Sequence, residues 1–311
     1  MKNKFVIYAN GSIQDGLGHL YRCLAIYSNF LKNEDCIFLH KNDFQRDFYV
    51  DRKLETKSIS EILGINDYVF LLDTKEEDIG FIENLVKAAS FSICVDTYRN
   101  WAKKFDAIVY PSFYYYKDLI DSFKKHTNVF YGKEFCILRK ADKVISYKPN
   151  ILLTFGGTDP NNLTLRILKL TQNKVDHGRI TALIGKGFTH RADNLKEKFP
   201  RVRFIKDLKT TFEIIQQSNI IVTALGTTVQ EVEFHQKRSI ICFNYSSDLS
   251  DFKRIISHSS NKDLWINGGK YNKLNNHKII YELNKTINND LKPNTNKNWG
   301  IGWYHLLKNP L

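Results

Sequence analysis

A histidine flanked by glycine near the N-terminus is the residue with the clearest chemical potential in this sequence. His19 follows Gly16-Leu17-Gly18, and Arg22 lies about one helical turn beyond it. The apolar run Phe5–Ala9 predicts a strand before the glycines, and His19–Leu31 predicts a helix after them. The positive end of a helix favours a neutral imidazole, the form that a general base requires. His19 is therefore a candidate base, although a lone histidine is more often structural. Arg22 could meet a phosphate or pair with a surface carboxylate.

Two more glycine-rich turns occur in the second half of the sequence. Gly156-Gly157-Thr158-Asp159 follows the apolar run Ile151–Phe155, and Gly226-Thr227-Thr228 follows Ile220–Thr223. Glycine lets backbone N–H groups approach a ligand, and the helix N-terminus behind it carries partial positive charge. The turn at Gly226 therefore predicts a diphosphate cradle with the threonine hydroxyls as extra donors. Thr158 and Asp159 could contact the ligand or only cap the next helix.

Glu231 lies about one turn beyond Gly226, where a carboxylate could accept both hydroxyls of a ribose. The same carboxylate would also stabilise the helix N-terminus without any ligand, so both roles stay open. The sequence contains no Asp-x-Asp pair for a metal-held diphosphate, no P-loop and no full G-x-G-x-x-G motif. We therefore expect no metal and no cofactor, and we regard ATP hydrolysis and hydride transfer as disfavoured.

The elements that must position these residues alternate between apolar runs and helix-period segments. Such alternation predicts an α/β protein with two doubly wound Rossmann-like domains. We expect an N-terminal domain over residues 1–145, a C-terminal domain over residues 150–290, and an aromatic tail, residues 291–311, that forms a docked helix. The mostly polar stretch Lys140–Asn150 is predicted to be the linker between the two domains. Ligands of such sheets bind at the carboxyl ends of the strands, so we expect the site in a cleft between the domains.

Composition sets the class of protein. With 311 residues, 42% of them apolar, the chain is long enough for two packed cores. We expect no signal peptide, and no apolar stretch approaches the roughly 20 residues that cross a bilayer. A soluble, cytoplasmic protein is the resulting expectation. The five cysteines are scattered, which predicts reduced, buried thiols rather than disulfides or a zinc site.

The net charge of +13 would attract polyanions. The lysines are nevertheless dispersed and no nucleic-acid-binding module is recognisable, so we expect no nucleic-acid partner. Compositional bias and a weak attraction to membrane surfaces both remain open explanations. The sequence does not fix the oligomeric state.

Taken together, these motifs resemble the UDP-sugar hydrolase of pseudaminic acid biosynthesis and its spore-coat polysaccharide relatives. The wider group is that of the MurG-like glycosyltransferases, which have the GT-B fold. The resemblance extends to about Phe252 and rests on the stretches 16–24, 155–164 and 226–231. Weaker matches lie at Leu71-Leu72-Asp73, at Cys94-Val95-Asp96 and between Gly132 and Arg139.

The resemblance implies a metal-independent, inverting hydrolase that releases UDP from a diacetamido deoxy sugar, with His19 as the base that activates water. It implies that uracil lies near Phe204-Ile205, ribose on Glu231 and the diphosphate at Thr227-Thr228. The residues expected to contact the substrate are Gly16, Gly18, Arg22, Asp73, Gly156, Gly157, Thr158, Ile205, Gly226, Thr227, Thr228 and Glu231.

Two stretches depart from the family pattern. Where the family carries a tyrosine near the sugar, this chain reads Thr74-Lys75-Glu76 after Asp73. Where the family has an Asn-Gln pair facing the sugar, it reads Asn244-Tyr245-Ser246-Ser247-Asp248. The nucleotide motifs are kept while the sugar motifs differ. Two alternatives therefore stay open, a GT-B glycosyltransferase of capsule or surface polysaccharide synthesis, and a UDP-binding module without turnover.

Overall fold

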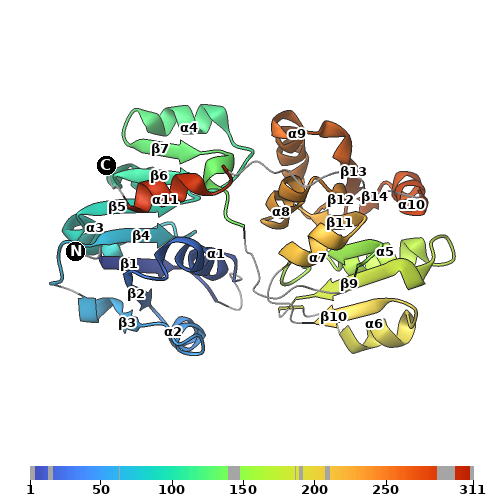
Figure 1. Cartoon of the computed structure of the whole chain (residues 1–311), viewed down its shortest axis with the longest axis horizontal. Coiled ribbons are helices and arrows are strands. Elements are labelled where there is room, and N and C mark those ends of the chain that lie inside the picture. Colours follow the sequence, from blue (N-terminus) through green and yellow to red (C-terminus); the bar gives the residue numbers. More distant parts are fainter. Residues whose placement is uncertain are drawn as a thin grey trace. The chain divides into compact units, whose positions relative to one another are not determined.

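The computed structural model describes residues 4–12, 17–62, 64–138, 148–185, 187–188, 192–206, 211–285 and 298–308. The chain forms two compact units, one of residues 1–137 with 297–311 and one of residues 138–296 (Figure 1). Gly16 and most of the predicted linker Lys140–Asn150 lie outside the described residues.

The N-terminal unit is built on a parallel sheet whose strand order, within the described residues, is β3-β2-β1-β4-β5-β6-β7. This order reverses direction at β1 and β4, as in doubly wound folds. The strands are β1 (Lys4–Ala9), β2 (Asp35–His40), β3 (Thr56–Ser58), β4 (Val69–Asp73), β5 (Phe91–Val95), β6 (Ala107–Tyr110) and β7 (Asn128–Tyr131).

Helices connect these strands. The α-helices are α1 (Gly18–Ile26), α2 (Asp43–Val50), α3 (Glu83–Ala88), α4 (Lys117–Lys124) and α11 (Ile301–Lys308). The π-helical turn is η1 (Tyr27–Leu31), and the 3-10 turns are η2 (Ile59–Ile62), η3 (Gly80–Ile82), η4 (Asn100–Lys104) and η5 (Lys133–Phe135). The predicted helix His19–Leu31 is thus α1 continued by a π turn.

Apolar side chains cover both faces of this sheet. Phe5 and Ile7 of β1 belong to one buried cluster, whereas Val6 and Tyr8 belong to another. Neighbouring side chains of a strand point to opposite faces, so a strand covered on both sides must be apolar throughout. This explains why continuous apolar runs predicted the strands well.

The aromatic tail forms a helix that packs on the N-terminal unit. Trp303 of α11 is fully buried in the same cluster as Phe5, and its Nε1 donates a hydrogen bond to the carbonyl of Phe135 at 2.7 Å. Helix α11 contacts both η5 and the π turn η1 that follows α1. The tail is therefore an integral part of the N-terminal core.

The C-terminal unit has a second sheet, which in the described residues runs β10-β9-β8-β11-β12-β13-β14. All its strand pairs are parallel except β13 with β14. The strands are β8 (Ile151–Thr154), β9 (Ile180–Ile184), β10 (Arg203–Lys206), β11 (Ile220–Ala224), β12 (Arg238–Phe243), β13 (Trp265–Lys270) and β14 (Lys273–Leu274). The helices are α5 (Leu163–Thr171), α6 (Ala192–Lys198), α7 (Phe212–Gln217), α8 (Thr228–His235), α9 (Asp248–His258) and α10 (Asn276–Asn284), with 3-10 turns η6 (His177–Arg179) and η7 (Lys262–Leu264).

The two sheets confirm the predicted fold class of two Rossmann-like α/β domains. All five cysteines are buried, as expected from the apolar runs that hold three of them. Within the described residues, every helix is too short or too polar to cross a bilayer.

Candidate active site in the N-terminal unit

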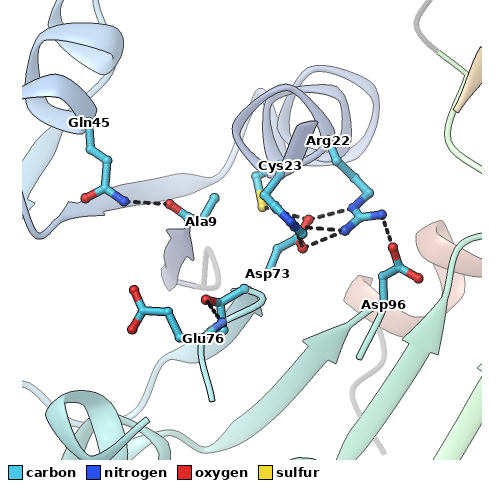
Figure 2. A network of polar contacts seen from close by, with 9 residues as sticks. Ala9, Arg22, Cys23, Gln45, Asp73, Glu76 and Asp96 are labelled. Carbon is cyan, nitrogen blue, oxygen red and sulfur yellow. Dashed lines mark hydrogen bonds and ion pairs between the residues drawn. The ribbon is translucent and has the colours of Figure 1, made fainter. Parts of the chain in front are cut away.

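Four side chains from three neighbouring elements meet at one edge of the N-terminal sheet. Asp73 ends β4, where it pairs with Ala9 of β1 on one side and with Val95 of β5 on the other. Asp96 follows β5, and His19 and Arg22 come from the first turns of α1. Figure 2 shows Arg22 reaching from α1 toward Asp73 and Asp96. The carboxyl ends of parallel strands thus gather these residues at the edge where α/β proteins bind ligands.

His19 is fixed by Asp73. Nδ1 of the imidazole lies 2.5 Å from Oδ1 of Asp73, and both residues are buried. A carboxylate can only accept, so this contact requires the hydrogen on Nδ1. Nε2 then carries the free lone pair, and in the described residues it has no hydrogen-bond partner. A buried carboxylate that holds an imidazole in this tautomer is the arrangement that general bases use.

Arg22 clamps the same carboxylate from the other side. Its Nε donates to Oδ2 of Asp73 at 2.6 Å and its Nη2 donates to Oδ1 at 2.7 Å, a bidentate pair. Nη2 also lies 3.0 Å from Nδ1 of His19, but a guanidinium only donates. The two groups therefore share Oδ1 as their acceptor. Nη1 of Arg22 donates to Asp96.

The charges of this network stabilise the ionised form of Asp73. Burial alone would raise the pKa of Asp73, but the Arg22 charge and the hydrogen bonds from Arg22 and His19 hold it below its ordinary value. Burial would likewise lower the pKa of Arg22, yet Asp73 and Asp96 raise it above its ordinary value. Arg22 thus pairs with two carboxylates, the fully buried Asp73 and the partly exposed Asp96.

Asp96 is a member of the network that the sequence motifs indicated only weakly. Its backbone adopts a positive φ of 54°, a conformation that aspartate and asparagine tolerate better than other side chains. This turn directs the carboxylate to Arg22, while 41% of the side chain stays exposed. The available signal was the repeat of an apolar strand ending in aspartate, at Asp73 and again at Asp96.

Glu76 lies in the stretch that departs from the family pattern, and it forms a second polar contact group. Its Oε1 accepts a hydrogen bond from the buried Tyr8 hydroxyl at 3.2 Å, and its Oε2 lies 3.2 Å from Nζ of Lys41. Nearby, Nε2 of Gln45 donates to the carbonyl of Ala9 at 3.0 Å, which ties α2 to the end of β1 (Figure 2). Glu76 is thus a partly buried carboxylate that is held by Tyr8 and Lys41.

In the C-terminal unit, the turn at Gly156 precedes α5, and a side chain already binds amides at the N-terminus of that helix. Oδ1 of Asp159 accepts from the Leu163 amide at 2.7 Å and Oδ2 from the Thr164 amide at 2.9 Å. Asp159 therefore caps α5, one of the two roles left open for it, and its charge offsets the positive helix end. Gly156 has a φ of +79°, and no atom lies within 4 Å of a Cβ added at Gly156 or Gly157.

The N-terminus of α8 differs from that of α5. Its N-cap residue, Thr227, makes no side-chain capping hydrogen bond, and the amides of Val229 and Gln230 donate to the carbonyls of Gly226 and Thr227. Gly226 leaves open space where a Cβ would stand. Glu231, in the first turn, is only 1% exposed, and its carboxylate accepts a hydrogen bond from the Thr211 hydroxyl. Ile205 lies on β10, half-buried.

The structure thus brings His19, Arg22 and Asp73 together in the N-terminal unit. Gly18 begins α1 beside them, whereas Gly16 lies outside the described residues. Thr158, Gly226, Thr227 and Thr228 lie at the carboxyl ends of β8 and β11 in the other unit. Among the described residues, no group of three or more His, Cys, Asp or Glu is arranged to hold a metal ion.

Comparison with known proteins gives one sequence relative and several similar structures. No protein-family model matches the chain. An uncharacterized protein of Methanocaldococcus jannaschii, MJ1062, is 25% identical over 260 residues, which are 74% of this chain and 54% of that protein. The chain therefore spans about half the length of the curated relative it matches.

The similar structures share the fold at low sequence identity. The glycotransferase of kitacinnamycin matches with a TM-score of 0.62 at 12% identity over 91% of each chain. UDP-GlcNAc 2-epimerase from Methanocaldococcus jannaschii matches with a TM-score of 0.61 at 12% identity over 99% of each chain. UGT89C1 of Arabidopsis thaliana, complexed with UDP-L-rhamnose, has a TM-score of 0.54 at 11% identity over 94% of this chain and 91% of the other. With its two doubly wound sheets, this chain has the GT-B fold.

Proposed function

We propose that this protein is a UDP-sugar enzyme in which His19 acts as the general base on the acceptor. The observation that carries the proposal is the contact of 2.5 Å between His19 Nδ1 and the buried Asp73, because it leaves Nε2 as the basic nitrogen. A base in this state can take a proton from water or from an alcohol as that oxygen attacks the anomeric carbon.

The nucleotide part of the proposal rests on the C-terminal unit. The N-terminus of α8, whose N-cap residue makes no side-chain hydrogen bond, offers partial positive charge to a diphosphate, and Gly226 leaves room for it. The helix N-terminus at α5 is less suited to phosphate, because Asp159 already caps it. Two of the similar structures carry UDP-sugars in their names, UDP-GlcNAc 2-epimerase and the UDP-L-rhamnose complex of UGT89C1, which supports UDP as the nucleotide.

For the finer activity, we propose inverting hydrolysis of a UDP-linked diacetamido deoxy sugar. Nε2 of His19 takes a proton from water, the resulting oxygen nucleophile forms a bond to the anomeric carbon, and the bond from that carbon to the UDP oxygen breaks. UDP leaves with both electrons of that bond, and the sugar gains a hydroxyl of inverted configuration. UDP is a good leaving group, so one base and electrostatic stabilisation are a sufficient catalytic set.

Incubation of the purified protein with the UDP-linked diacetamido sugar, followed by quantification of UDP, tests this activity. A characterised hydrolase of the same substrate serves as the positive control, and His19→Gln as the matched loss of the base. UDP release in buffer alone that depends on His19 supports hydrolysis. No release above background, while the control enzyme turns over, contradicts it.

A second candidate is a glycosyltransferase with an alcohol acceptor in surface-polysaccharide synthesis. Glu76, with its contacts to Tyr8 and Lys41, stands in the stretch after Asp73 where the hydrolase pattern is lost, and it favours a different polar acceptor. The glycotransferase of kitacinnamycin among the similar structures also fits this candidate. UDP release that appears only after addition of a saccharide or lipid acceptor favours the transferase. UDP binding without turnover of any UDP-sugar, with or without acceptors, would contradict both activities.

A further inference from the structure

Two cations lie around one aromatic ring at the carboxyl edge of the C-terminal sheet. Nζ of Lys270, at the end of β13, lies 5.9 Å from the centroid of the Tyr271 ring, and the guanidinium of Arg166, in the first turn of α5, lies 5.4 Å from the same centroid. Lys270 is half-buried, and neither cation forms an ion pair with any of the described residues. Because like charges repel and a half-buried ammonium is partly desolvated, this cluster favours an anion as its partner.

Neutral groups hold the two cations in place. Nζ of Lys270 donates a hydrogen bond to Oγ of Ser246 at 2.8 Å. Nε of Arg166 donates to the carbonyl of Asn161 at 3.0 Å, and Nδ2 of Asn161 donates in turn to Oδ1 of Asn244 at 3.0 Å. The bond between Asn161 and Asn244 joins the turns that follow β8 and β12, and β11 lies between these two strands in the sheet. The cluster therefore lies at the same edge of the sheet as the glycine turn that follows β11.

The carboxylates of the same two turns are engaged by backbone amides. Both oxygens of Asp159 accept from amides at the start of α5. Oδ2 of Asp248 accepts from the amides of Asn244 and Tyr245 at 2.9 and 3.1 Å. Both aspartates are buried, at 2% and 7% exposure. Their charges thus stabilise the turns themselves, and the two cations remain for a ligand.

We propose that Lys270 and Arg166 bind an anionic group of the ligand, either a phosphate of the diphosphate or a carboxylate on the sugar. The ammonium and the guanidinium are donors only, and the Ser246 hydroxyl, which accepts from Lys270, directs its own hydrogen elsewhere. A phosphate or carboxylate group is the complement of such a donor set, because it only accepts and has several oxygens. The inference rests on the proposed function for the identity of the ligand as a nucleotide sugar. The anion site itself does not depend on that function.

Lys270→Gln tests the site, because glutamine removes the charge and keeps a donor for Ser246. Lys273→Gln, at an exposed lysine of β14, is the matched control. Calorimetric titrations with pyrophosphate, UDP, UDP-glucose and UDP-glucuronate give the affinities. If the partner is a phosphate, Lys270→Gln should weaken binding of UDP and of both UDP-sugars about tenfold or more, and should weaken pyrophosphate binding as well. If the partner is a sugar carboxylate, only UDP-glucuronate should be weakened. Lys273→Gln should bind all four ligands like the parent protein.

The outcomes separate this inference from the proposed function. If the parent protein binds UDP and Lys270→Gln binds all four ligands within about twofold of it, the anion site is overturned and the nucleotide proposal stands. If only pyrophosphate binds, and does so through Lys270, the anion site stands and the nucleotide proposal fails. A parent protein that binds none of the four contradicts both.

Two further variants test the charge itself. Lys270→Arg keeps the positive charge and should retain most of the affinity, so a loss as large as that of Lys270→Gln counts against the proposal. Arg166→Gln should weaken the same ligands several-fold, less than Lys270→Gln because Arg166 is exposed, with the exposed Lys169→Gln of the same helix as its control. Equal affinities in Arg166→Gln and Lys169→Gln would exclude Arg166 from the site. The effects of both cations should shrink in about 0.5 M salt.

Discussion

His19 Nδ1 and Asp73 Oδ1 lie 2.5 Å apart although 54 residues separate them in the sequence. His19 lies in the first turn of α1, and Asp73 ends β4, the strand that pairs with β1. The contact therefore exists only when α1 and β4 are both in place. Under the proposed function, this contact orients His19 as the base, and the Asp73 carboxylate then matters as much as the imidazole.

We therefore expect Asp73→Asn to reduce UDP release nearly as much as His19→Gln, by roughly 10²–10⁴-fold. The amide can accept or donate at Nδ1, so the imidazole loses both its fixed tautomer and the support for its positive form. Initial rates of UDP release measure the effect, with the exposed His126→Gln as the control. A rate for Asp73→Asn within a few-fold of the parent protein would rule out the proposed role of the dyad.

Because Arg22 pairs with Asp73, Asp73→Asn should also lower the free energy of unfolding. Loss of the Asp73 charge leaves a buried guanidinium with only the partly exposed Asp96, and an uncompensated buried charge costs about 3–5 kcal/mol. Asp96→Asn should cost less than about 1 kcal/mol, because that end of the pair is close to water. Urea unfolding followed by tryptophan fluorescence compares the two. Equal losses of stability in the two variants would contradict the role of Asp73 as the main buried partner of Arg22.

Two glycines of the C-terminal unit, Gly157 and Gly185, allow ligand contact and packing to be tested separately. A Cβ on Gly157 meets no atom within 4 Å, whereas a Cβ on Gly185 would lie 2.4 Å from the carbonyl oxygen of Gly157. Gly157→Ala should leave the melting temperature unchanged but weaken UDP or UDP-sugar binding tenfold or more, if a ligand occupies the open space. Gly185→Ala should lower both the melting temperature and the affinity for the ligand, because it displaces the turn itself. Calorimetric titration gives the affinities, and undiminished binding by Gly157→Ala would show that this turn does not contact the ligand.

The fold was predictable wherever a strand is covered on both faces. The apolar runs Phe5–Ala9, Ile151–Phe155 and Ile220–Thr223 coincide with the strands β1, β8 and β11 to within one residue at each end. Short helices with largely exposed faces were missed, as with α2 (Asp43–Val50) and α4 (Lys117–Lys124), since few apolar residues mark their period.

The site was predictable in its residue types but not in its connections. His19, Arg22 and Asp73 are each named by the motifs, yet nothing in their spacing indicates that Asp73 accepts from both others. Asp96 reaches Arg22 across 74 positions of sequence through a backbone turn of positive φ. Such contacts depend on the order of strands in the sheet, which an individual motif does not contain. The resemblance therefore pointed to His19, and only the three-dimensional arrangement identified the side chains that contact it.

The C-terminal helix gives a prediction for the N-terminal core. Trp303 is fully buried and its indole donates to the carbonyl of Phe135. Trp303→Ala should destabilise the protein by about 3–5 kcal/mol through the lost packing and the unpaired carbonyl. Tyr304→Ala, on an exposed position of the same helix, is the matched control and should change stability little. Thermal unfolding compares the two, and similar melting temperatures would contradict the integral role of α11.

His235 of the C-terminal unit should make stability depend on pH. The imidazole is 1% exposed and lies 4.3 Å, centroid to centroid, from the Phe212 ring. Burial, with a smaller contribution from Lys237, lowers the pKa of His235 from 6.5 to about 4. The unfolded chain therefore binds this proton more tightly than the folded one, so stability present above pH 6.5 is lost as the pH falls toward 4. The loss should reach roughly 2–3 kcal/mol at the lower limit.

His235→Phe should remove this dependence, whereas His126→Gln should keep it, and unfolding curves at pH 7 and pH 5 compare them. An equally steep pH dependence in His235→Phe would assign the effect to another group.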